Sequence, residues 1–291
     1  PLTDHFDRAL VLVQSAIVAV NLGQAVPDEF PREYLGYFNR FGSSLRAGER
    51  IEWTAPGTEQ QIVYDHASRK KLVLTGAKSY QSAAEMRGWI MELNAEKDSY
   101  TFKAIAGPKL IGRYPPELAQ RVLEAVGEFQ RDKFQSSKVL IHGLTDYDLN
   151  DQPVRVAETH HLEMLDPNDV AARCEEIGQL KDGWLEGEGI APSPDRLQAF
   201  VNAWNAAATD RLPLPFIYPT PDGGIQMEWT QDIWEISAEV DLNELSAELL
   251  AVNVKTGESR EADVVLVDPE GWEPMIDFVN QAGEGAEPVH A

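Results

Sequence analysis

The sequence predicts an α+β protein built from three consecutive parts, residues 1–80, 81–166 and 167–291. Two observations carry this prediction. Stretches whose apolar residues recur every three or four positions are typical of amphipathic helices. Short runs of alternating apolar and polar residues, bounded by glycine, proline and asparagine, are typical of strands and turns. The two patterns follow one another in a different order in each part, so each part is expected to have its own architecture.

The first part is expected to combine helices with short strands. Apolar residues at helical spacing predict a helix over 3–22; they are Phe6, Leu10, Val13, Ile17 and Val20. Pro31 begins a shorter helix, and Gly42 is a natural stop for it. Residues 49–75 alternate apolar and polar side chains as strands do, and 71–74 (KLVL) also have a β-like composition.

The second part is expected to be a small OB-like β-barrel. Strands are predicted over 86–93, 99–105, 109–114, 138–143 and 153–165, with a helix that begins near Pro115 between the third and the fourth. This order of three strands, a helix and two strands is typical of an OB-type barrel. Gly88, inside the first strand, suits the bend that such a barrel needs.

The third part is expected to be an acidic α-β4-α module. One helix runs from Pro167 to Ile177, and a second begins at a cap formed by Ser193 or Asp195. Prolines between 213 and 221 predict a stiff extended approach to a four-stranded antiparallel meander. The meander strands are expected over 225–230, 233–241, 247–255 and 262–267, and a helix over 269–281 closes the module.

The negative charge of the chain is concentrated in its last part. Residues 1–80 carry 9 Lys/Arg and 9 Asp/Glu, residues 81–165 carry 10 and 13, and residues 166–291 carry 6 and 26. Of the formal charge of −23, the last stretch therefore contributes −20 (6 − 26). Such a charge repels nucleic acid and anionic membranes, and it favours a basic protein as the partner.

Composition indicates a soluble cytoplasmic protein of a bacterial type. The longest apolar stretch, residues 9–20, is shorter than the roughly 20 residues of a membrane span. No basic leader or small-residue cleavage signal accompanies it, so no secretory peptide is expected. The single cysteine, Cys174, allows no intramolecular disulfide and fits a reducing compartment.

Two strings in the third part carry a family resemblance. LKDGWLEGEG at 180–189 and PLPFIYPTPDGGIQMEW at 213–229 are joined by a short predicted helix. This arrangement resembles a module of uncharacterised bacterial proteins with a DGW…PTPDGG-x-x-x-EW signature. The string VLIHGLTDYDLNDQPVRV, at 139–156, resembles the barrel that precedes this module in such chains. The resemblance implies a shared fold, and it carries over no activity and no catalytic residue.

Four carboxylates of the third part are candidates for acid/base catalysis in a hydrolase. They are Glu186, Glu188, Asp222 and Glu228, and Trp184 and Trp229 would be the platforms for a sugar. The alternative is that both tryptophans anchor the core and that Asp222 only turns the chain. Four acids among 26 are expected by chance, so this alternative is favoured.

One turn has the first ligands of a calcium loop, because Asp146, Asp148 and Asn150 stand at alternate positions. Asp151 replaces the glycine of such a loop, and Ala157 replaces its bidentate glutamate. A hairpin turn between two strands is therefore expected here.

Histidines on the last barrel strands suggest a second possible metal site. His161 and Glu163 share one strand face, with His142 as a possible third ligand, whereas His160 points to the opposite face. Isolated histidines on strands are usually packed or solvated, so no metal and no other cofactor is expected. Cys174 lies on a predicted helix beside Glu175 and Glu176, whose charges disfavour a thiolate nucleophile.

The barrel offers a further alternative, the binding of single-stranded nucleic acid. The candidate stacking residues are Trp89, Tyr100, Phe102 and Tyr114, and the candidate phosphate contacts are Lys103, Lys109 and Arg113. The net charge of residues 81–165, −3 (10 − 13), opposes this function. Core packing is therefore the expected role of the aromatic residues.

These observations favour a non-enzymatic binding protein. The acidic module is expected to engage a basic protein partner, as a neutraliser or an antitoxin-like factor would, because its carboxylates steer association with a basic surface. The residues expected at the contact are Trp184, Trp229, Asp222, Glu228, Asp232, Glu235 and Glu239. A carboxylate-based hydrolase and a nucleic-acid-binding barrel are the alternatives.

Overall fold

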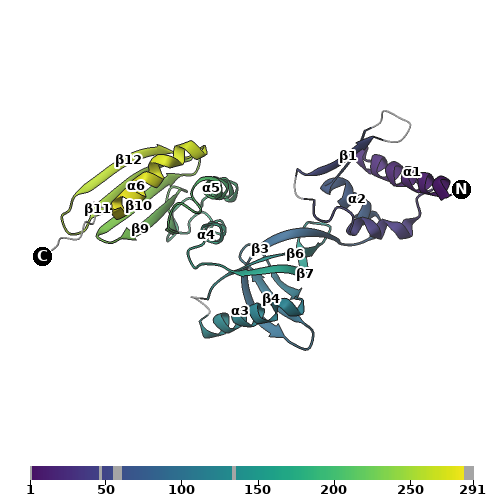
Figure 1. Cartoon of the computed structure of the whole chain (residues 1–291), viewed down its shortest axis with the longest axis horizontal. Helices are drawn as coiled ribbons and strands as arrows, with labels where there is room; N and C mark the ends of the chain where they lie inside the picture. Colours follow the sequence, from purple (N-terminus) through teal and green to yellow (C-terminus); the bar gives the residue numbers. More distant parts are fainter. Residues whose placement is uncertain (1, 46–47, 55–60, 133–135, 285–291) are drawn as a thin grey trace. The chain divides into compact units, whose positions relative to one another are not determined.

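The computed structural model describes residues 2–45, 48–54, 61–132 and 136–284, and it contains both helices and strands throughout (Figure 1). The chain therefore belongs to the α+β class. It divides into two compact units, Pro1–Met164 and Leu165–Ala291. The described residues form three hydrophobic cores, two in the first unit and one in the second.

The N-terminal part of the first unit packs helices against two antiparallel strands. Its elements are α1 (Leu2–Asn21), η1 (a 3-10 helix, Arg32–Asn39), β1 (Arg50–Thr54), β2 (Gln61–Asp65) and α2 (His66–Gly76). Buried side chains from several of them, among them Ile17, Leu35, Tyr64 and Leu72, form one core. Burial of apolar surface between these elements stabilises them, since helices in proteins owe most of their stability to the packing of an apolar face.

Residues 71–74 are helical, so the strand predicted there is wrong. Asp65 caps α2, because its carboxylate accepts a hydrogen bond from the Ser68 backbone N–H at 2.8 Å. The buried residues of α2 recur at helical spacing, namely Ser68, Arg69, Leu72 and Val73. A short apolar run alone does not distinguish a buried helix from a buried strand, and the capping residue Asp65 was the additional signal for a helix.

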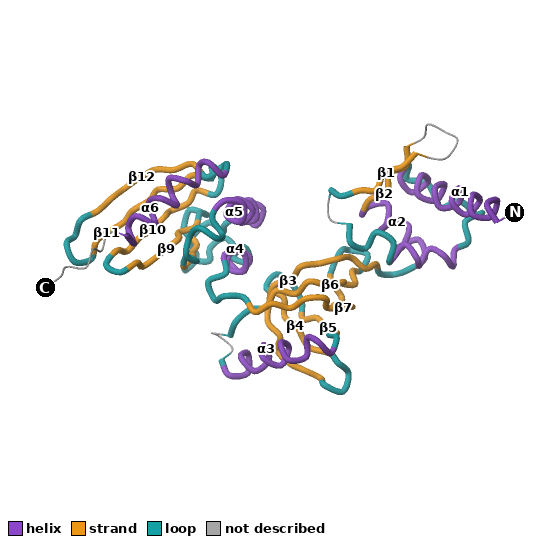
Figure 2. The backbone as a smooth tube through the Cα atoms, in the orientation of Figure 1, coloured by secondary structure: helices purple, strands orange, loops and turns teal. Residues whose placement is uncertain are grey.

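Five strands of the first unit form a closed barrel (Figure 2). Its elements are β3 (Tyr80–Asn94), β4 (Ser99–Ala104), β5 (Lys109–Arg113), η2 (Pro116–Leu118), α3 (Ala119–Arg131), β6 (Val139–Tyr147) and β7 (Pro153–Met164). The order around the barrel is β3-β4-β5-β7-β6, and β6 closes it by pairing with β3. Neighbouring strands are antiparallel except β5 and β7, which are parallel.

Gly88 marks the point at which β3 passes from one partner strand to another. Residues before it pair with β6, residues after it pair with β4, and Gly88 itself lies opposite both Val139 and Ala104. A Cβ at this position would lie 2.1 Å from the carbonyl oxygen of Lys103. Glycine is therefore required at this bend, because only a residue without a side chain lets the two backbones approach so closely.

Arg69 of α2 joins the N-terminal part to the barrel. The side chain is fully buried and donates hydrogen bonds to the carbonyl oxygens of Phe38, Asn39 and Gln81. Gln81 belongs to β3, and its backbone N–H donates to the Asn39 side chain at 2.7 Å. A buried charge is costly unless it is hydrogen-bonded, so these three carbonyls fix the position of η1 relative to β3.

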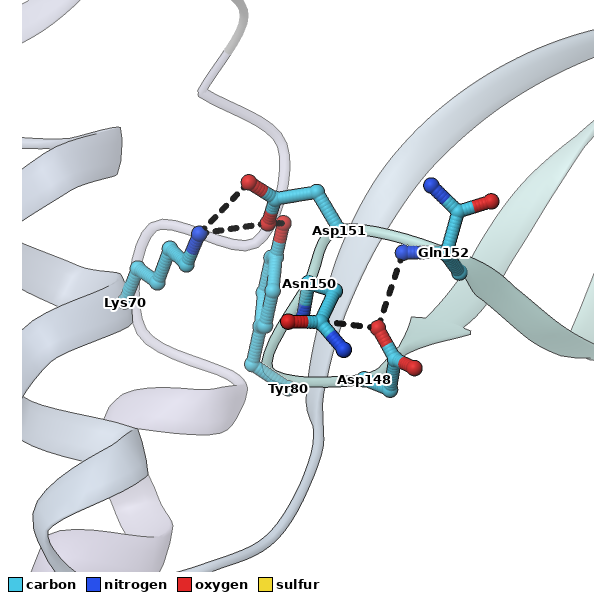
Figure 3. Close-up of polar contacts among 6 residues, drawn as sticks. All are labelled: Lys70, Tyr80, Asp148, Asn150, Asp151 and Gln152. Carbon is cyan, nitrogen blue, oxygen red and sulfur yellow. Dashed lines mark hydrogen bonds and ion pairs between the residues drawn. The ribbon is translucent and has the colours of Figure 1, made fainter.

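A second junction lies at the turn between β6 and β7 (Figure 3). Asp151 Oδ2 is 2.7 Å from Lys70 Nζ of α2, and the Tyr80 hydroxyl donates to Asp151 Oδ1 at 2.6 Å. In the same turn Asp148 Oδ1 accepts hydrogen bonds from the backbone N–H groups of Asn150 and Gln152, at 2.8 and 2.9 Å. The segment proposed as a possible calcium loop is thus a hairpin turn whose carboxylates bind backbone and side-chain donors of the protein itself.

The second unit is a five-stranded antiparallel sheet with helices on one face (Figure 1). Its elements are α4 (Val170–Ile177), α5 (Pro194–Ala207), β8 (Phe216–Pro219), β9 (Ile225–Gln231), β10 (Trp234–Asp241), β11 (Ser246–Asn253), β12 (Ser259–Val265), η3 (Pro269–Trp272) and α6 (Glu273–Glu284). The order is β12-β11-β10-β9-β8. Four strands were predicted; β8 is a fifth, which lies at the edge, where proline is tolerated.

The core of the second unit lies between this sheet and its helices. Trp204 of α5 and Trp272 of η3 are almost completely buried and meet edge to face, with ring centroids 5.9 Å apart. The Trp272 indole donates a hydrogen bond to the Leu266 carbonyl oxygen at 3.0 Å. Alternate residues of each central strand point into this core, among them Met227, Ile236, Ala238, Leu249 and Ala251. The remaining residues of each strand point to the opposite face of the sheet.

We predict that Gly88→Ala destabilises the first unit. The added methyl group meets backbone rather than a flexible side chain, so the expected loss in the free energy of unfolding is about 1–3 kcal/mol or more. Gly127→Ala in α3 is the matched control, since nothing lies within 4 Å of its Cβ position, and it is expected to stabilise by up to about 1 kcal/mol. Urea unfolding followed by circular dichroism measures both; equal effects would contradict this role of Gly88.

We also predict that the contact of Asp151 with α2 depends on pH. Hydrogen bonds from Lys70 and Tyr80 lower the pKa of Asp151. The pKa of Asp151 is lower in the folded state than in the unfolded state, where it is about 4. The contact therefore stabilises the folded protein fully above pH ~4, and this stabilisation is lost as the pH falls through the folded-state pKa. The carboxylate is exposed, so the effect is at most about 1 kcal/mol.

Hydrogen exchange of the α2 amides tests this prediction. Asp151→Asn is expected to increase exchange relative to the wild type at neutral pH and to have no effect well below pH ~4. Asp98→Asn is the control, because Asp98 also has a positive φ in a strand turn (46°, against 60° for Asp151). An equal change in the control, or an effect of Asp151→Asn that persists at low pH, would contradict the assignment.

Candidate functional site

The outward face of the C-terminal sheet is acidic. In β9 to β12 the buried residues alternate with outward-pointing ones, so one face belongs to the core and the other to solvent. The acidic residues at outward positions are Glu228, Glu235, Glu239, Asp241, Glu248, Glu261 and Asp263. We call this set the acidic face. Within β8 to β12, which are described completely, Arg260 is the one basic residue, and it lies over the Trp234 ring on the other face.

The strand register places like charges directly opposite each other. Glu239 of β10 pairs with Glu248 of β11, and Glu248 pairs with Asp263 of β12. Directly opposite side chains have Cβ atoms about 4.5–5.5 Å apart, and like charges in such positions are destabilising. No ion pair compensates these three carboxylates within the described part of the chain. The row therefore concentrates negative charge at a cost in folding free energy.

Two adjoining hollows lie on the acidic face. One, of about 330 Å³, is bordered by Glu239, Glu248, Glu261 and Asp263. The other, of about 360 Å³, is bordered by Glu228 and Glu235. Gln226, Ser237 and Leu250 border both hollows, so they form one continuous depression. A concave acidic surface of this kind focuses its field on cationic groups that enter it.

Apolar side chains accompany the carboxylates on the same face. Phe216 of β8 lies opposite Glu228, and Tyr218 lies opposite Gln226. Both aromatic side chains are exposed, at 53% and 45%, and Leu250 is exposed at 38%. Exposed aromatic residues next to a charged depression are typical of protein contact surfaces, where they supply apolar area that charged groups do not.

The residues predicted at the contact fall in different places. Glu228, Glu235 and Glu239 lie on the acidic face. Asp222 lies in the turn between β8 and β9, and Asp232 lies in the turn between β9 and β10, so they are at opposite ends of β9. These two turn residues flank the face rather than belong to it.

Neither predicted tryptophan is part of the acidic face. Trp229 is buried in the core and donates its indole N–H to the Pro213 carbonyl oxygen at 2.9 Å. Trp184 is half-buried and bonds within its own loop, to the Ile190 carbonyl oxygen at 3.1 Å. Trp229 points inward because it stands two and four positions after Met227 and Ile225, the other buried residues of β9, and alternate residues of a strand share one face.

The four carboxylates proposed for a hydrolase do not share an enclosed environment. Glu186, Glu188 and Asp222 are exposed, and Glu228 is half-buried and accepts a hydrogen bond from Gln226 at 2.7 Å. A hydrogen bond from the Thr220 hydroxyl lowers the pKa of Asp222. A general acid needs a raised pKa, so this arrangement offers Asp222 no such role.

The barrel histidines form a cluster without the geometry of a metal site. His142 lies opposite His161, with ring centroids 5.7 Å apart, and His142 Nδ1 is 3.4 Å from Glu85 Oε1. His160 and His142 also line an open pocket of about 490 Å³. Among the described residues, no group of three or more His, Cys, Asp or Glu is arranged to hold a metal ion.

The remaining candidates are mostly core residues. Tyr100, Phe102 and Tyr114 are buried in the barrel, so they cannot stack on a ligand, whereas Trp89 is half-buried. Burial raises the pKa of the Cys174 thiol to about 12, which keeps it protonated at neutral pH.

Several residues of the acidic face were not among the contact residues predicted from the sequence. Asp241, Glu248 and Asp263 lie in predicted strands, where their alternation with apolar residues was the available signal; Glu261 lies just before the strand predicted over 262–267, which begins at Ser259 in the structure. That alternation identifies which residues share a face within one strand. It does not give the pairing between strands, which is what brings Glu239, Glu248 and Asp263 together.

No protein-family model matches the chain, and no curated protein or solved structure matches it either. The similarity of residues 180–189 and 213–229 to a bacterial family therefore stays a prediction. In the described residues, no helix has the length and apolar character needed to cross a membrane.

Proposed function

We propose that the chain is a binding protein whose acidic face docks on a basic surface of a partner protein. The row Glu239–Glu248–Asp263 is the observation that carries this proposal. Its carboxylates repel one another in the free protein, and a cationic partner would relieve that repulsion on binding. A role in solubility alone needs no such register, because scattered charges serve it equally well.

The chemistry of the partner follows from the shape and composition of the face. Its lysines or arginines would enter the two hollows, and an apolar patch beside them would contact Phe216, Tyr218 and Leu250. Association would be fast at low ionic strength and slower as salt screens the charges. A neutralising, antitoxin-like role in the cytoplasm is the biological setting that this chemistry supports best.

We infer that the barrel of the first unit is of the OB type. Three features support this inference: the order β3-β4-β5-β7-β6, the parallel contact between β5 and β7, and the helix α3 between β5 and β6. The antiparallel pairing of each strand of the second unit with its chain neighbour similarly supports a meander. Neither fold type implies a function by itself.

A pull-down with the full chain at low salt tests the proposed function. The wild type is expected to retain a basic protein that is released when salt shortens the Debye length to about 3 Å. A variant with Glu239→Gln, Glu248→Gln and Asp263→Asn is expected to lose that protein. The control variant carries Glu186→Gln, Glu188→Gln and Asp210→Asn, which change the charge equally at exposed positions outside the sheet.

The two variants separate the acidic face from total charge. Retention of the partner by the control and its loss from the acidic-face variant would support the proposal. Equal loss from both variants would show that net charge suffices, and equal retention by both would place the binding site elsewhere. Either of these two results would contradict the proposed function.

A further inference from the structure

The barrel carries a basic face that is distinct from the acidic face of the second unit. Trp89 of β3 lies opposite Lys103 of β4, and Lys103 lies opposite Lys109 of β5. All three point outward, because the buried residues of these strands occupy the alternate positions. Arg113 continues the same side of β5, two positions beyond Ile111. We call these residues, with Lys138, the basic face.

In the first unit, as in the second, residues of one charge are gathered on one face. Four of the ten Lys/Arg residues of 81–165 belong to the basic face, namely Lys103, Lys109, Arg113 and Lys138. Glu92 is the acidic residue opposite Thr101 on these strands, and it accepts a hydrogen bond from the Thr101 hydroxyl at 3.3 Å. The net charge of −3 for residues 81–165 therefore conceals a locally positive surface.

An aromatic ring lies within the basic face. Trp89 is half-buried, and Lys138 Nζ lies 5.7 Å from the centre of its ring. The exposed Ile111 provides an apolar neighbour on β5, opposite Thr101 of β4. A nucleobase stacks on such a ring regardless of its identity, and a lysine at the ring is placed to contact the adjoining phosphate.

We propose that the basic face binds single-stranded nucleic acid, with a base stacked on Trp89 and phosphates along Lys103, Lys109 and Arg113. A single strand fits better than a duplex, because the base must present its face to the Trp89 ring. Lys103 on β4 and Lys109 and Arg113 on the neighbouring strand β5 offer three cations to a phosphate backbone, whereas an isolated small anion would need only one of them. This proposal is independent of the acidic face.

The acidic charge of residues 166–291 does not by itself exclude this binding, because salt screens charge over distance. At about 0.1 M salt the Debye length is about 10 Å, so repulsion from charges farther away is largely screened. Contacts within the basic face are short and much less affected. The formal charge of −23, summed over the whole chain, is therefore a poorer guide to nucleic-acid binding than the charges within the basic face.

Fluorescence anisotropy of a labelled deoxythymidine dodecamer with the full chain tests the proposal. About three phosphate contacts on a single strand predict that a fourfold rise in salt weakens binding by about 20-fold. Lys109→Gln with Arg113→Gln is expected to weaken binding and to flatten this salt dependence. Trp89→Leu is expected to weaken binding about fivefold or more with the salt dependence unchanged. Lys78→Gln, an exposed residue of the same unit, is the control and is expected to have no effect.

A competition experiment identifies the class of ligand. Displacement of the dodecamer by unlabelled oligonucleotide, but not by an equally charged polyglutamate peptide, would support the proposal. Equal displacement by polyglutamate, together with no effect of Trp89→Leu, would assign the face to acidic proteins and overturn it. Absence of binding at low salt, or unchanged binding by Lys109→Gln with Arg113→Gln, would overturn it as well. None of these variants alters the acidic face, so failure here leaves the proposed function standing.

Discussion

The register of the C-terminal sheet is the constraint on which the functional proposal depends. Pairing of β10 with β11 and of β11 with β12 places Glu239, Glu248 and Asp263 in one row. A slip by one residue would turn these side chains toward the core. The register is held from the other face, where alternate apolar residues pack on helices around Trp204 and Trp272. Apolar burial on one face thus holds together repelling charges on the other.

The sequence predicted the positions of helices and strands better than it predicted which strands pair with one another. The alternation in 225–265 placed four of the five strands of the C-terminal sheet, the strand-helix-strand order in 81–165 placed the barrel strands, and Gly88 was recognised as a bend. Two elements were misjudged for local reasons. The run 71–74 belongs to a helix that Asp65 caps and that buries one face. The strand β8 was read as part of an approach segment because four prolines lie between 213 and 221.

The candidate site was predictable only in part, because it depends on distance across strands. Glu228, Glu235 and Glu239 were recognised, whereas Glu248, Glu261 and Asp263 were not, since nothing within one strand shows which residue lies opposite. Trp229 was wrongly placed at the contact surface. Its position in the alternation of β9 marks it as a core residue, but it was chosen because tryptophan is common at contact surfaces. Net charge was also an incomplete guide, because it hid the basic face of the barrel.

The measurement that tests the central claim most directly is the stability of the acidic-face variant without any partner. Five of the seven tryptophans belong to the second unit, so urea unfolding followed by tryptophan fluorescence reports mainly on that unit. At about 20 mM salt, Glu239→Gln with Glu248→Gln and Asp263→Asn is expected to raise the free energy of unfolding by about 0.5–2 kcal/mol, and the gain should shrink at high salt. A loss of stability at low salt would show that these carboxylates serve the fold, and it would contradict their assignment to a binding surface.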